Sequence, residues 1–200
     1  AAQHSQSLEA WFTHVPGIKV VFPSTPSDAL GLIISSIRDD NPVLFVEHKL
    51  LYAVEGEVPD TDEPIPLGVA DVKRPGKDVT IVATGLMVSE ALEARKVLAE
   101  QGIDAAVINI HTIKPLDAEL IAKYAAKTGA VITVEEHSII GGLGGAVCEA
   151  LSECCPTPVV RVGINDTFGK SGPAAELLKI YGLSAANIVE QTKKAISLKK

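Results

Sequence analysis

Strands and helices are predicted to alternate after Gly76, and this alternation constrains the fold more than any other feature of the chain. The predicted strands are Val79–Ala83, Ala105–Ile110, Ala130–Val134 and Pro158–Val162, and the helices are Val88–Gln101, Asp117–Lys127 and Gly144–Cys154, with two more from about Pro173 and Ala185. Strands joined through helices form right-handed βαβ crossovers in a mainly parallel sheet. The sequence therefore predicts an α/β domain over residues 66–200.

The first 47 residues carry a separate set of predicted elements. They are a helix from Ser5 to His14, a short strand over Ile18–Phe22, a helix that begins at Ser24–Asp28 and ends near Arg38, and a buried strand at Val43–Val46. Residues 48–65 are rich in proline and acidic side chains and lack a sustained period, which favours a surface linker. One more short strand is expected at Gly68–Val72.

Composition excludes two classes of partner. Hydrophobic residues make up 46% of the chain and charged residues 22%, a balance typical of a globular protein with a core. The net charge of −7 argues against a nucleic-acid partner, and no apolar run approaches the roughly 20 residues that span a membrane. Ala1 opens no basic and apolar leader, so we expect a soluble, cytoplasmic protein. Without a C-x-x-C pair, the three cysteines are expected to be reduced thiols.

Several stretches together resemble the thiamine diphosphate-dependent transketolase superfamily. Gln3–Phe12, Val15–Val21, Ser36–Pro42 and Glu47–Tyr52 resemble the beta subunit of 2-oxo acid dehydrogenases of the pyruvate, acetoin and branched-chain type. Gly76–Gly85 resembles the opening of the transketolase C-terminal domain, whereas Thr133–Gly144, Asp166–Gly169 and Tyr181–Leu183 are more similar to the C-terminal half of split bacterial transketolases. The resemblance covers nearly the whole chain and leans toward two different relatives.

The resemblance implies a specific domain order. Residues 1–47 would be the C-terminal part of a pyrimidine-binding domain and residues 48–65 a linker. Residues 66–200 would be a transketolase C-terminal domain with a mainly parallel five-stranded sheet flanked by helices. In the intact enzyme the family implies thiamine diphosphate and Mg²⁺. The family's cofactor-activating glutamate lies in a part that this chain lacks, and no Gly-Asp-Gly motif occurs. We therefore expect no cofactor to bind tightly to this chain alone.

The resemblance also implies partners. They are a second copy of the chain in a homodimer, a partner subunit or N-terminal segment that binds the cofactor diphosphate, and a lipoyl-bearing acyltransferase. Neither nucleic acid nor a membrane is expected as a partner.

His4 is the candidate catalytic residue. By resemblance, it matches the beta-subunit histidine that faces the thiazolium ring and handles protons during acyl transfer to lipoyl. An imidazole suits this role because its ordinary pKa lies near neutrality. The alternative is a loop histidine without a chemical role.

Ser36, Asp39 and Asn41 resemble a potassium site of the dehydrogenase beta subunits, in which carbonyl groups at the end of a helix and the start of a strand surround the ion. Unpaired carbonyls at a helix C-terminus are ready ligands for a hard cation. The alternative is that Asp39–Pro42 forms a simple turn, which its composition also predicts.

Two further motifs could bind a ligand, but we favour a structural role for each. Gly141–Gly145 begins like a dinucleotide fingerprint, but Val147 occupies its last position, so close helix packing or a subunit contact is the preferred interpretation. An anion at this helix N-terminus is the alternative. Glu135–His137 is predicted at the carboxyl edge of a parallel strand, where ligands bind in open α/β sheets, and an interface role is preferred over a substrate contact. His14, His48 and His111 show no metal-ligand spacing.

The sequence leaves three functions open. The favoured one is the C-terminal portion of a thiamine diphosphate-dependent 2-oxo acid dehydrogenase beta-type subunit, which takes part in oxidative decarboxylation and acyl transfer to lipoyl. The second is the C-terminal section of a transketolase that transfers ketol units between sugar phosphates. The third is a non-catalytic dimerisation or assembly module.

Overall fold

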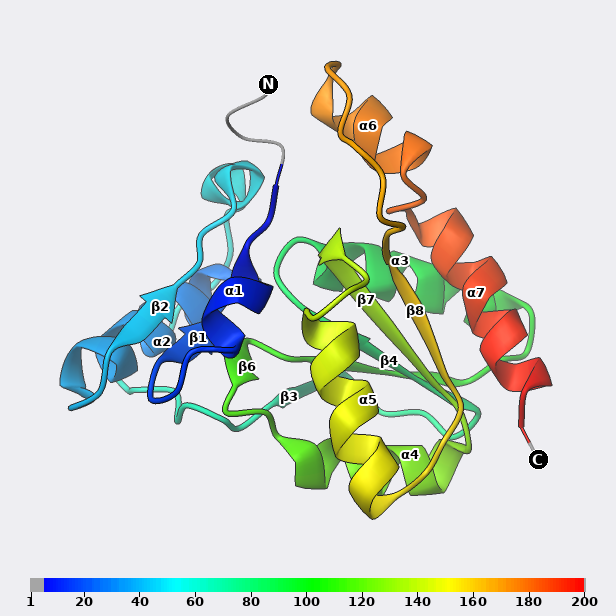
Figure 1. Ribbon diagram of the computed structural model, residues 1–200, viewed down its shortest axis with the longest axis horizontal. Coiled ribbons are helices and arrows are strands. Elements are labelled where there is room, and N and C mark those ends of the chain that lie inside the picture. The colour runs from blue at the N-terminus through cyan, green and yellow to red at the C-terminus, as the bar shows by residue number, and fades with distance from the viewer. Residues whose placement is uncertain (1–5, 200) are drawn as a thin grey trace.

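A computed structural model describes residues 6–199, which form two sheets and the helices around them (Figure 1). The strands are β1 (Lys19–Val21), β2 (Val43–Phe45), β3 (Asp71–Arg74), β4 (Val79–Ala83), β5 (Ala105–Asn109), β6 (Thr112–Lys114), β7 (Val131–Ser138) and β8 (Val159–Ile164). The helices are α1 (Glu9–Thr13), α2 (Pro26–Arg38), α3 (Met87–Glu100), α4 (Ala118–Thr128), α5 (Leu143–Cys154), α6 (Ala174–Ile180) and α7 (Ala185–Ser197), with a 3-10 helix, η1, over Lys49–Ala53.

The larger sheet has the strand order β3-β5-β4-β7-β8. The four strands β5, β4, β7 and β8 are parallel to one another, and only the edge strand β3 runs antiparallel, to β5. The predicted mainly parallel, five-stranded sheet is therefore confirmed. β4 is buried along its whole length, because helices cover the sheet on both faces and leave no solvated side.

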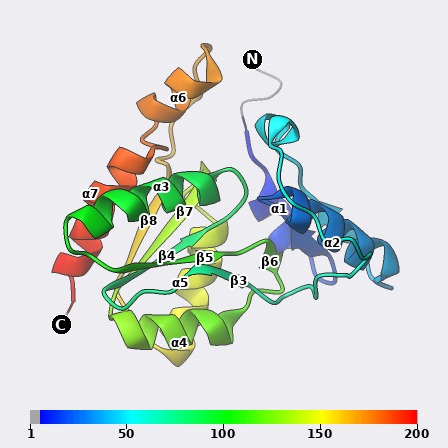
Figure 2. The ribbon, with the colours of Figure 1, turned by 180° about the vertical axis from the view of Figure 1, so that it is seen from behind.

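Two apolar cores lie on opposite faces of this sheet. One core packs α3 and α7 against β4, β5, β7 and β8, and includes Ile81, Leu98 and Ile188. The other packs α4 and α5 against the sheet around Ile108 and Leu143. Figures 1 and 2 view the sheet from opposite sides. Helix α5 lies in front of the sheet in Figure 1, and helix α3 lies in front of it in Figure 2. Burial of these faces is the main driving force for the fold.

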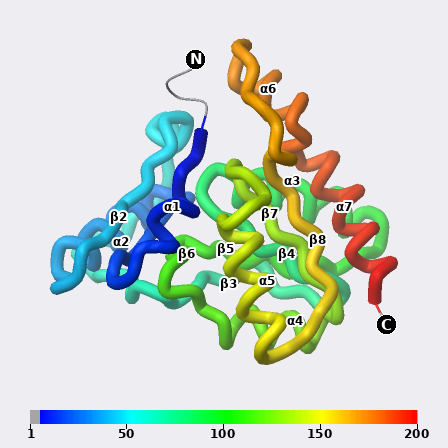
Figure 3. The backbone as a smooth tube through the Cα atoms, viewed as in Figure 1, coloured from blue at the N-terminus to red at the C-terminus, as the bar shows by residue number. Residues whose placement is uncertain are grey.

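The smaller sheet has the order β2-β1-β6 and forms a second lobe with α1 and α2. β1 and β2 are parallel, with α2 as their crossover, and β6 from the C-terminal half pairs antiparallel with β1. The tube in Figure 3 shows this path, in which the green β6 segment lies beside the blue N-terminal segment. Thr25 and Asp28 form a reciprocal capping box that starts α2 at Pro26.

The N-terminal lobe packs against the carboxyl edge of the parallel strands. Gly85 follows β4 with φ +54°, and a Cβ atom at this position would lie 2.5 Å from the ring of Phe22. Only glycine permits both this backbone conformation and this close approach. The Phe22 N–H also donates to the carbonyl of His111 at 2.9 Å, which ties the two lobes through their main chains.

Several predicted boundaries were wrong. β7 extends to Ser138, so Glu135–His137 lies within the strand and not beyond it, because β7 pairs with β8 again at Ser138, opposite Ile164, after an irregularity that follows Val134. η1 occupies part of the predicted linker, where the side chain of His48 accepts from the Leu50 N–H. β3 begins at Asp71 and not at Gly68. β6 was not predicted, because its pairing with β1 is a tertiary contact that no local pattern records.

None of the helices between residues 6 and 199 has the length and apolar character that crossing a bilayer requires.

Candidate functional site

A cleft of about 850 Å³ opens at the carboxyl edge of the larger sheet. Four segments line it, namely the chain before α1, the loop after β2, the end of β7, and the chain from the end of β8 through α6. The residues that carry polar or charged groups into the cleft include Gln6, Ser7, Glu47, His48, Lys49, Glu136, Ser138, Asp166 and Lys170, and the apolar wall includes Leu50, Ile164, Phe168, Leu177 and Tyr181. Ligands of parallel α/β sheets bind outside the carboxyl ends of the strands, so this cleft is the candidate site.

His48 and Glu136 join the two lobes on the wall of the cleft. The Nδ1 atom of His48 accepts the N–H of Leu50 at 3.2 Å, so the ring proton belongs on Nε2. Nε2 lies 3.1 Å from Oε2 of Glu136, to which it donates. Both side chains are partly exposed to the cleft. Both ring nitrogens are engaged, so the imidazole positions Glu136 and offers no free nitrogen to a ligand.

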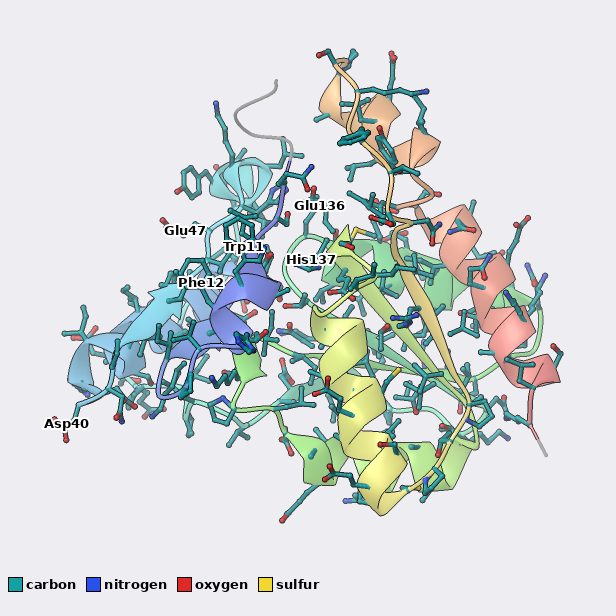
Figure 4. The ribbon with its side chains drawn as sticks, viewed as in Figure 1. Trp11, Phe12, Asp40, Glu47, Glu136 and His137 are labelled. Carbon is teal, nitrogen blue, oxygen red and sulfur yellow. The ribbon has the colours of Figure 1, made fainter. Side chains whose placement is uncertain are left out.

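A buried cluster of Glu9, Glu135 and His137 lies behind this wall. Oε2 of Glu9 is 3.7 Å from Nε2 of His137, and Oε2 of Glu135 is 3.7 Å from Nδ1 of the same ring. The Ala10 N–H also points at Nε2, at 3.4 Å. Burial raises the pKa of Glu9 and of Glu135 above the ordinary carboxyl value. In Figure 4, helix α1, which carries Trp11 and Phe12, lies beside the end of β7, which carries Glu136 and His137.

The glycine-rich motif, Gly141–Gly145, holds the Glu135 carboxylate of this cluster. The N–H groups of Leu143 and Gly144 at the start of α5 donate to the two carboxylate oxygens of Glu135 at 2.7 and 2.8 Å. A Cβ atom on Gly142 would lie 2.1 Å from Oε2 of Glu135, so the carboxylate needs a glycine there. The favoured interpretation of this motif, close packing, agrees with this geometry. A bound anion, the alternative interpretation, would have to displace the Glu135 carboxylate, which already accepts the N–H groups at this helix N-terminus.

A second buried polar cluster joins α2 to the end of β5. Oδ2 of Asp28 accepts from the N–H and hydroxyl of Ser24 at 3.0 and 2.6 Å and from the side chain of Asn109 at 2.9 Å. Burial by itself would raise the pKa of Asp28, but the Ser24 hydrogen bonds and the charge of Lys73 together hold that pKa below its ordinary value. Burial lowers the pKa of His111 beside this cluster, which favours the neutral ring.

The predicted site residues that the structure describes, Ser36, Asp39 and Asn41, are not among the residues that line the cleft. His4 lies outside the described residues. The Ser36 hydroxyl donates to the Leu32 carbonyl at 2.7 Å. Asp39 pairs with Lys19 through one oxygen and accepts from Asn41 through the other. The hydrogen bonds from Lys19 and Asn41 lower the pKa of Asp39 to about 2. The neighbouring Asp40 in Figure 4 lies at the far end of the N-terminal lobe from the cleft.

Sequence reasoning missed three of the residues that join the lobes. Glu9 sits on an amphipathic helix with nothing to mark it as buried, and His48 was assigned no role. Asn109 was missed although one signal pointed to it, since polar residues that end a buried parallel strand lie on the edge where ligands and partners bind.

Two family models cover most of the chain. The transketolase C-terminal domain matches residues 68–188, which is more than half of the chain. The chain belongs to the transketolase family. The transketolase pyrimidine-binding domain matches residues 1–55. The predicted membership, with parts of two transketolase domains in this order, is confirmed.

Relatives of two kinds resemble this member of the transketolase family. The acetoin:2,6-dichlorophenolindophenol oxidoreductase subunit beta of Cupriavidus necator is 52% identical over 138 residues, which are 69% of this chain and 41% of that protein. The pyruvate dehydrogenase E1 component subunit beta of Rickettsia felis is 40% identical over 197 residues, 97% of this chain and 60% of that protein. A solved structure described as a split gene transketolase, inactive beta4 tetramer, is 42% identical with a TM-score of 0.87, over 96% of this chain and 62% of that one.

The predicted resemblance to both dehydrogenase beta subunits and split transketolases is thus confirmed. The chain spans about half of the length of the curated relatives that it matches.

Proposed function

We propose that this chain is the C-terminal part of a beta-type subunit of a thiamine diphosphate-dependent 2-oxo acid dehydrogenase, which decarboxylates a 2-oxo acid oxidatively and passes the acyl group to lipoyl. The observation that carries the proposal is the 40% identity to a pyruvate dehydrogenase beta subunit over 197 residues, because it runs through both lobes and the cleft between them. The acetoin oxidoreductase subunit, at 52% identity, supports the same reaction class.

The described residues do not fit the diphosphate end of the cofactor. Three carboxylates, from Glu47, Glu136 and Asp166, line the cleft beside two lysines, so its charge does not favour a diphosphate. The N-terminus of α5 beside it already holds Glu135. In the part of the chain from residue 6 to 199, no group of three or more His, Cys, Asp or Glu side chains is arranged to hold a metal ion. The proposal therefore assigns the diphosphate and Mg²⁺ to another chain or segment.

This chain's share in the proposed enzyme is to build one wall of the cleft and to hold the N-terminal segment in place. The contacts between Glu9 and His137 and between His48 and Glu136 fix that segment against β7. By resemblance, His4 is proposed to move protons during acyl transfer. In the full-length protein, His4→Ala is expected to cripple acyl transfer and to leave cofactor affinity nearly unchanged. Unchanged overall turnover would remove His4 from the proposal.

Donor assays on the full-length protein with its partner subunit, thiamine diphosphate and Mg²⁺ test the reaction. We expect decarboxylation of pyruvate or a branched 2-oxo acid with an artificial electron acceptor, and no ketol transfer from xylulose 5-phosphate. Ketol transfer without decarboxylation would establish the second candidate, a transketolase. The 42% identity and TM-score of 0.87 to a split gene transketolase favour that candidate.

A non-catalytic assembly module is the candidate from another class, and the description of the same solved structure as an inactive beta4 tetramer favours it. Two measurements on the 200-residue chain separate it from the others. Titration calorimetry with thiamine diphosphate and Mg²⁺ is expected to give no heat of binding, and micromolar binding would contradict our assignment of the diphosphate to another chain. Sedimentation measures the oligomeric state. If the chain sediments only as a monomer at high concentration, the result would contradict both the assembly module and the homodimer.

A further inference from the structure

The loop between β8 and α6 forms part of one wall of the cleft and has few contacts with the rest of the chain. Each residue from 165 to 173 is exposed, and Asp166, Phe168 and Lys170 line the cleft. Within residues 6–199, one hydrogen bond ties the middle of this loop, residues 167–172, to the rest of the structure. The Tyr181 hydroxyl donates it to the Phe168 carbonyl at 2.9 Å. A segment with so few buried contacts has low local stability.

The backbone at the two ends of the loop allows it to move. Asp166 has φ +43° and is the one non-glycine residue among residues 6–199 with a positive φ. This conformation is uncommon outside glycine, and it marks Asp166 as the point where the chain turns away from β8. Near the other end, a Cβ atom on Gly172 would meet Leu177 at 3.4 Å and nothing closer. A few residues at the ends of a loop are sufficient to take up the change in φ and ψ when the loop swings.

The loop and the wall that faces it are complementary. Figures 1 and 2 show α6 and the chain after β2 rising on either side of the end of β7. Each side of the cleft carries one carboxylate, one lysine and one exposed large apolar side chain. These residues are Asp166, Lys170 and Phe168 on the loop, and Glu47, Lys49 and Leu50 on the facing wall.

The six complementary side chains are unpaired across the open cleft. In the described part of the chain, residues 6–199, none of the four charged groups takes part in an ion pair. Phe168 is 95% exposed and Leu50 is 45% exposed, so both apolar side chains face water. Opposite charges and apolar surfaces on two facing walls favour the approach of the walls.

We propose that the loop of residues 165–173 is a lid, which closes the cleft when Phe168 packs on Leu50 and Lys170 pairs with Glu47. The hydrogen bond from Tyr181 to Phe168 holds the lid in the open position. A cleft of about 850 Å³ has the volume of a small-molecule site, so the closed lid separates a bound small molecule from water. The lid belongs to the cleft, and it does not depend on which of the proposed reactions the cleft serves.

The other polar groups of the cleft do not compete for the same partners. Glu136 is already held by His48 at 3.1 Å. A hydrogen bond to Glu47 raises the pKa of the Tyr52 hydroxyl, which keeps that hydroxyl protonated and leaves the charge of Glu47 in place. Lys49 and Asp166, the remaining two charged groups of the walls, form a second pair of opposite sign. Closure therefore brings each lysine of the walls toward a carboxylate.

Disulfide trapping in the 200-residue chain tests the lid. Leu50→Cys and Phe168→Cys are combined in a variant whose three native cysteines are replaced with alanine, with the fold checked by circular dichroism. The rate of disulfide formation is measured under an oxidant at low ionic strength. A disulfide requires the two Cα atoms to come within about 7 Å, so the rate reports the approach of the two walls. We expect an intramolecular disulfide.

Charge substitutions in the trapping variant identify the cause of closure. Lys170→Glu places two carboxylates on facing walls and should slow trapping roughly threefold or more, because like charges disfavour closure. Addition of Glu47→Lys restores opposite charges and should return the rate to within about twofold of the original. Lys179→Glu is the matched control, because Lys179 is exposed on α6 but does not line the cleft, and it should leave the rate unchanged. These differences should vanish in about 1 M salt, where the Debye length is about 3 Å.

Four results would overturn the lid. The first is the absence of an intramolecular disulfide although both thiols react with a maleimide. The second is an equal rate in Lys170→Glu, and the third is no recovery after addition of Glu47→Lys. The fourth is a disulfide between two copies of the chain, which would assign Phe168 to a contact with a second copy.

If the variant without native cysteines does not fold, competitive acylation of lysines in the chain that keeps them decides. Lys170 should react more slowly than Lys179 at low ionic strength, because the pair with Glu47 shields its amine. The two lysines should react equally fast in Glu47→Gln. Equal reactivity in the wild-type chain, measured by mass spectrometry, would refute the lid.

Discussion

The side-chain amide of Asn109 at the end of β5 donates a 2.9 Å hydrogen bond to Asp28 near the start of α2, across a sequence separation of 81 residues. Both groups are buried, and the same carboxylate oxygen also accepts from Ser24 and Thr25. One carboxylate therefore caps a helix of the N-terminal lobe and fixes that lobe to the larger sheet. The Asp28 carboxylate receives the hydrogen bond from Asn109 only when both lobes are in place.

Replacement of Asp28 with Ala is expected to lower the free energy of unfolding by about 2–4 kcal/mol, because it removes the capping box and leaves the buried donors of Ser24 and Asn109 without an acceptor. Denaturation by urea measures the change. Asp40→Ala is the control, since Asp40 is exposed at the far end of the same lobe and should change stability by less than about 0.5 kcal/mol. Equal effects of the two substitutions would contradict this role of Asp28.

Acid should remove the contribution of Asp28. The folded-state pKa of Asp28 is below its ordinary value of 3.8, so the stabilisation is fully present above that value and is lost as the pH falls through the lowered pKa. The difference in unfolding free energy between the wild-type chain and Asp28→Asn is expected to be constant above about pH 5 and to shrink on acidification. Urea denaturation at a series of pH values measures it. A difference that stays the same down to about pH 2 would refute the ionised Asp28.

Two glycines at the start of α5 should respond in opposite ways to alanine. A Cβ atom on Gly142 would lie 2.1 Å from Oε2 of Glu135 and 2.6 Å from Nδ1 of His137, so Gly142→Ala must displace the buried carboxylate and lose about 1–3 kcal/mol. A Cβ atom on Gly145 meets nothing within 4 Å, so Gly145→Ala should gain up to about 1 kcal/mol from helix propensity. Thermal unfolding of both variants measures the contrast, and a stable Gly142→Ala variant would disprove the close packing of Glu135.

The proposed potassium site at Ser36, Asp39 and Asn41 predicts an ion-specific stabilisation of the full-length protein. An ion that binds only the folded state raises the unfolding temperature, so melting in potassium chloride is expected above melting in tetramethylammonium chloride at the same ionic strength. Asp39→Ala should abolish the difference, because it removes the turn in which Asp39 accepts from Asn41. Equal midpoints in the two salts for the wild-type protein would count against a bound ion.

The regular elements could be predicted from the sequence because their determinants are local. The β4 strand, Val79–Ala83, was predicted residue for residue, since a continuous β-branched and apolar run between breakers admits one assignment. α4 ends at Gly129 in the left-handed conformation that only glycine adopts freely, and its end was predicted within one residue. By contrast, β6 and η1 have no such pattern and exist because of their neighbours.

The sequence by itself determined the α/β class, the mainly parallel sheet and membership of the transketolase family, because hydrophobic period and local motifs are properties of short segments. Only the tertiary structure decided which polar side chains meet. Glu9 and His137, or Asp28 and Asn109, belong to elements far apart in the chain and meet at the junction of the two lobes. Burial there raises the pKa of Glu9, whereas at Asp28 the effect of burial is outweighed by the Ser24 hydrogen bonds and the charge of Lys73, which lower the pKa. No local pattern encodes that junction, because the lobes fix each other's position only when both have folded.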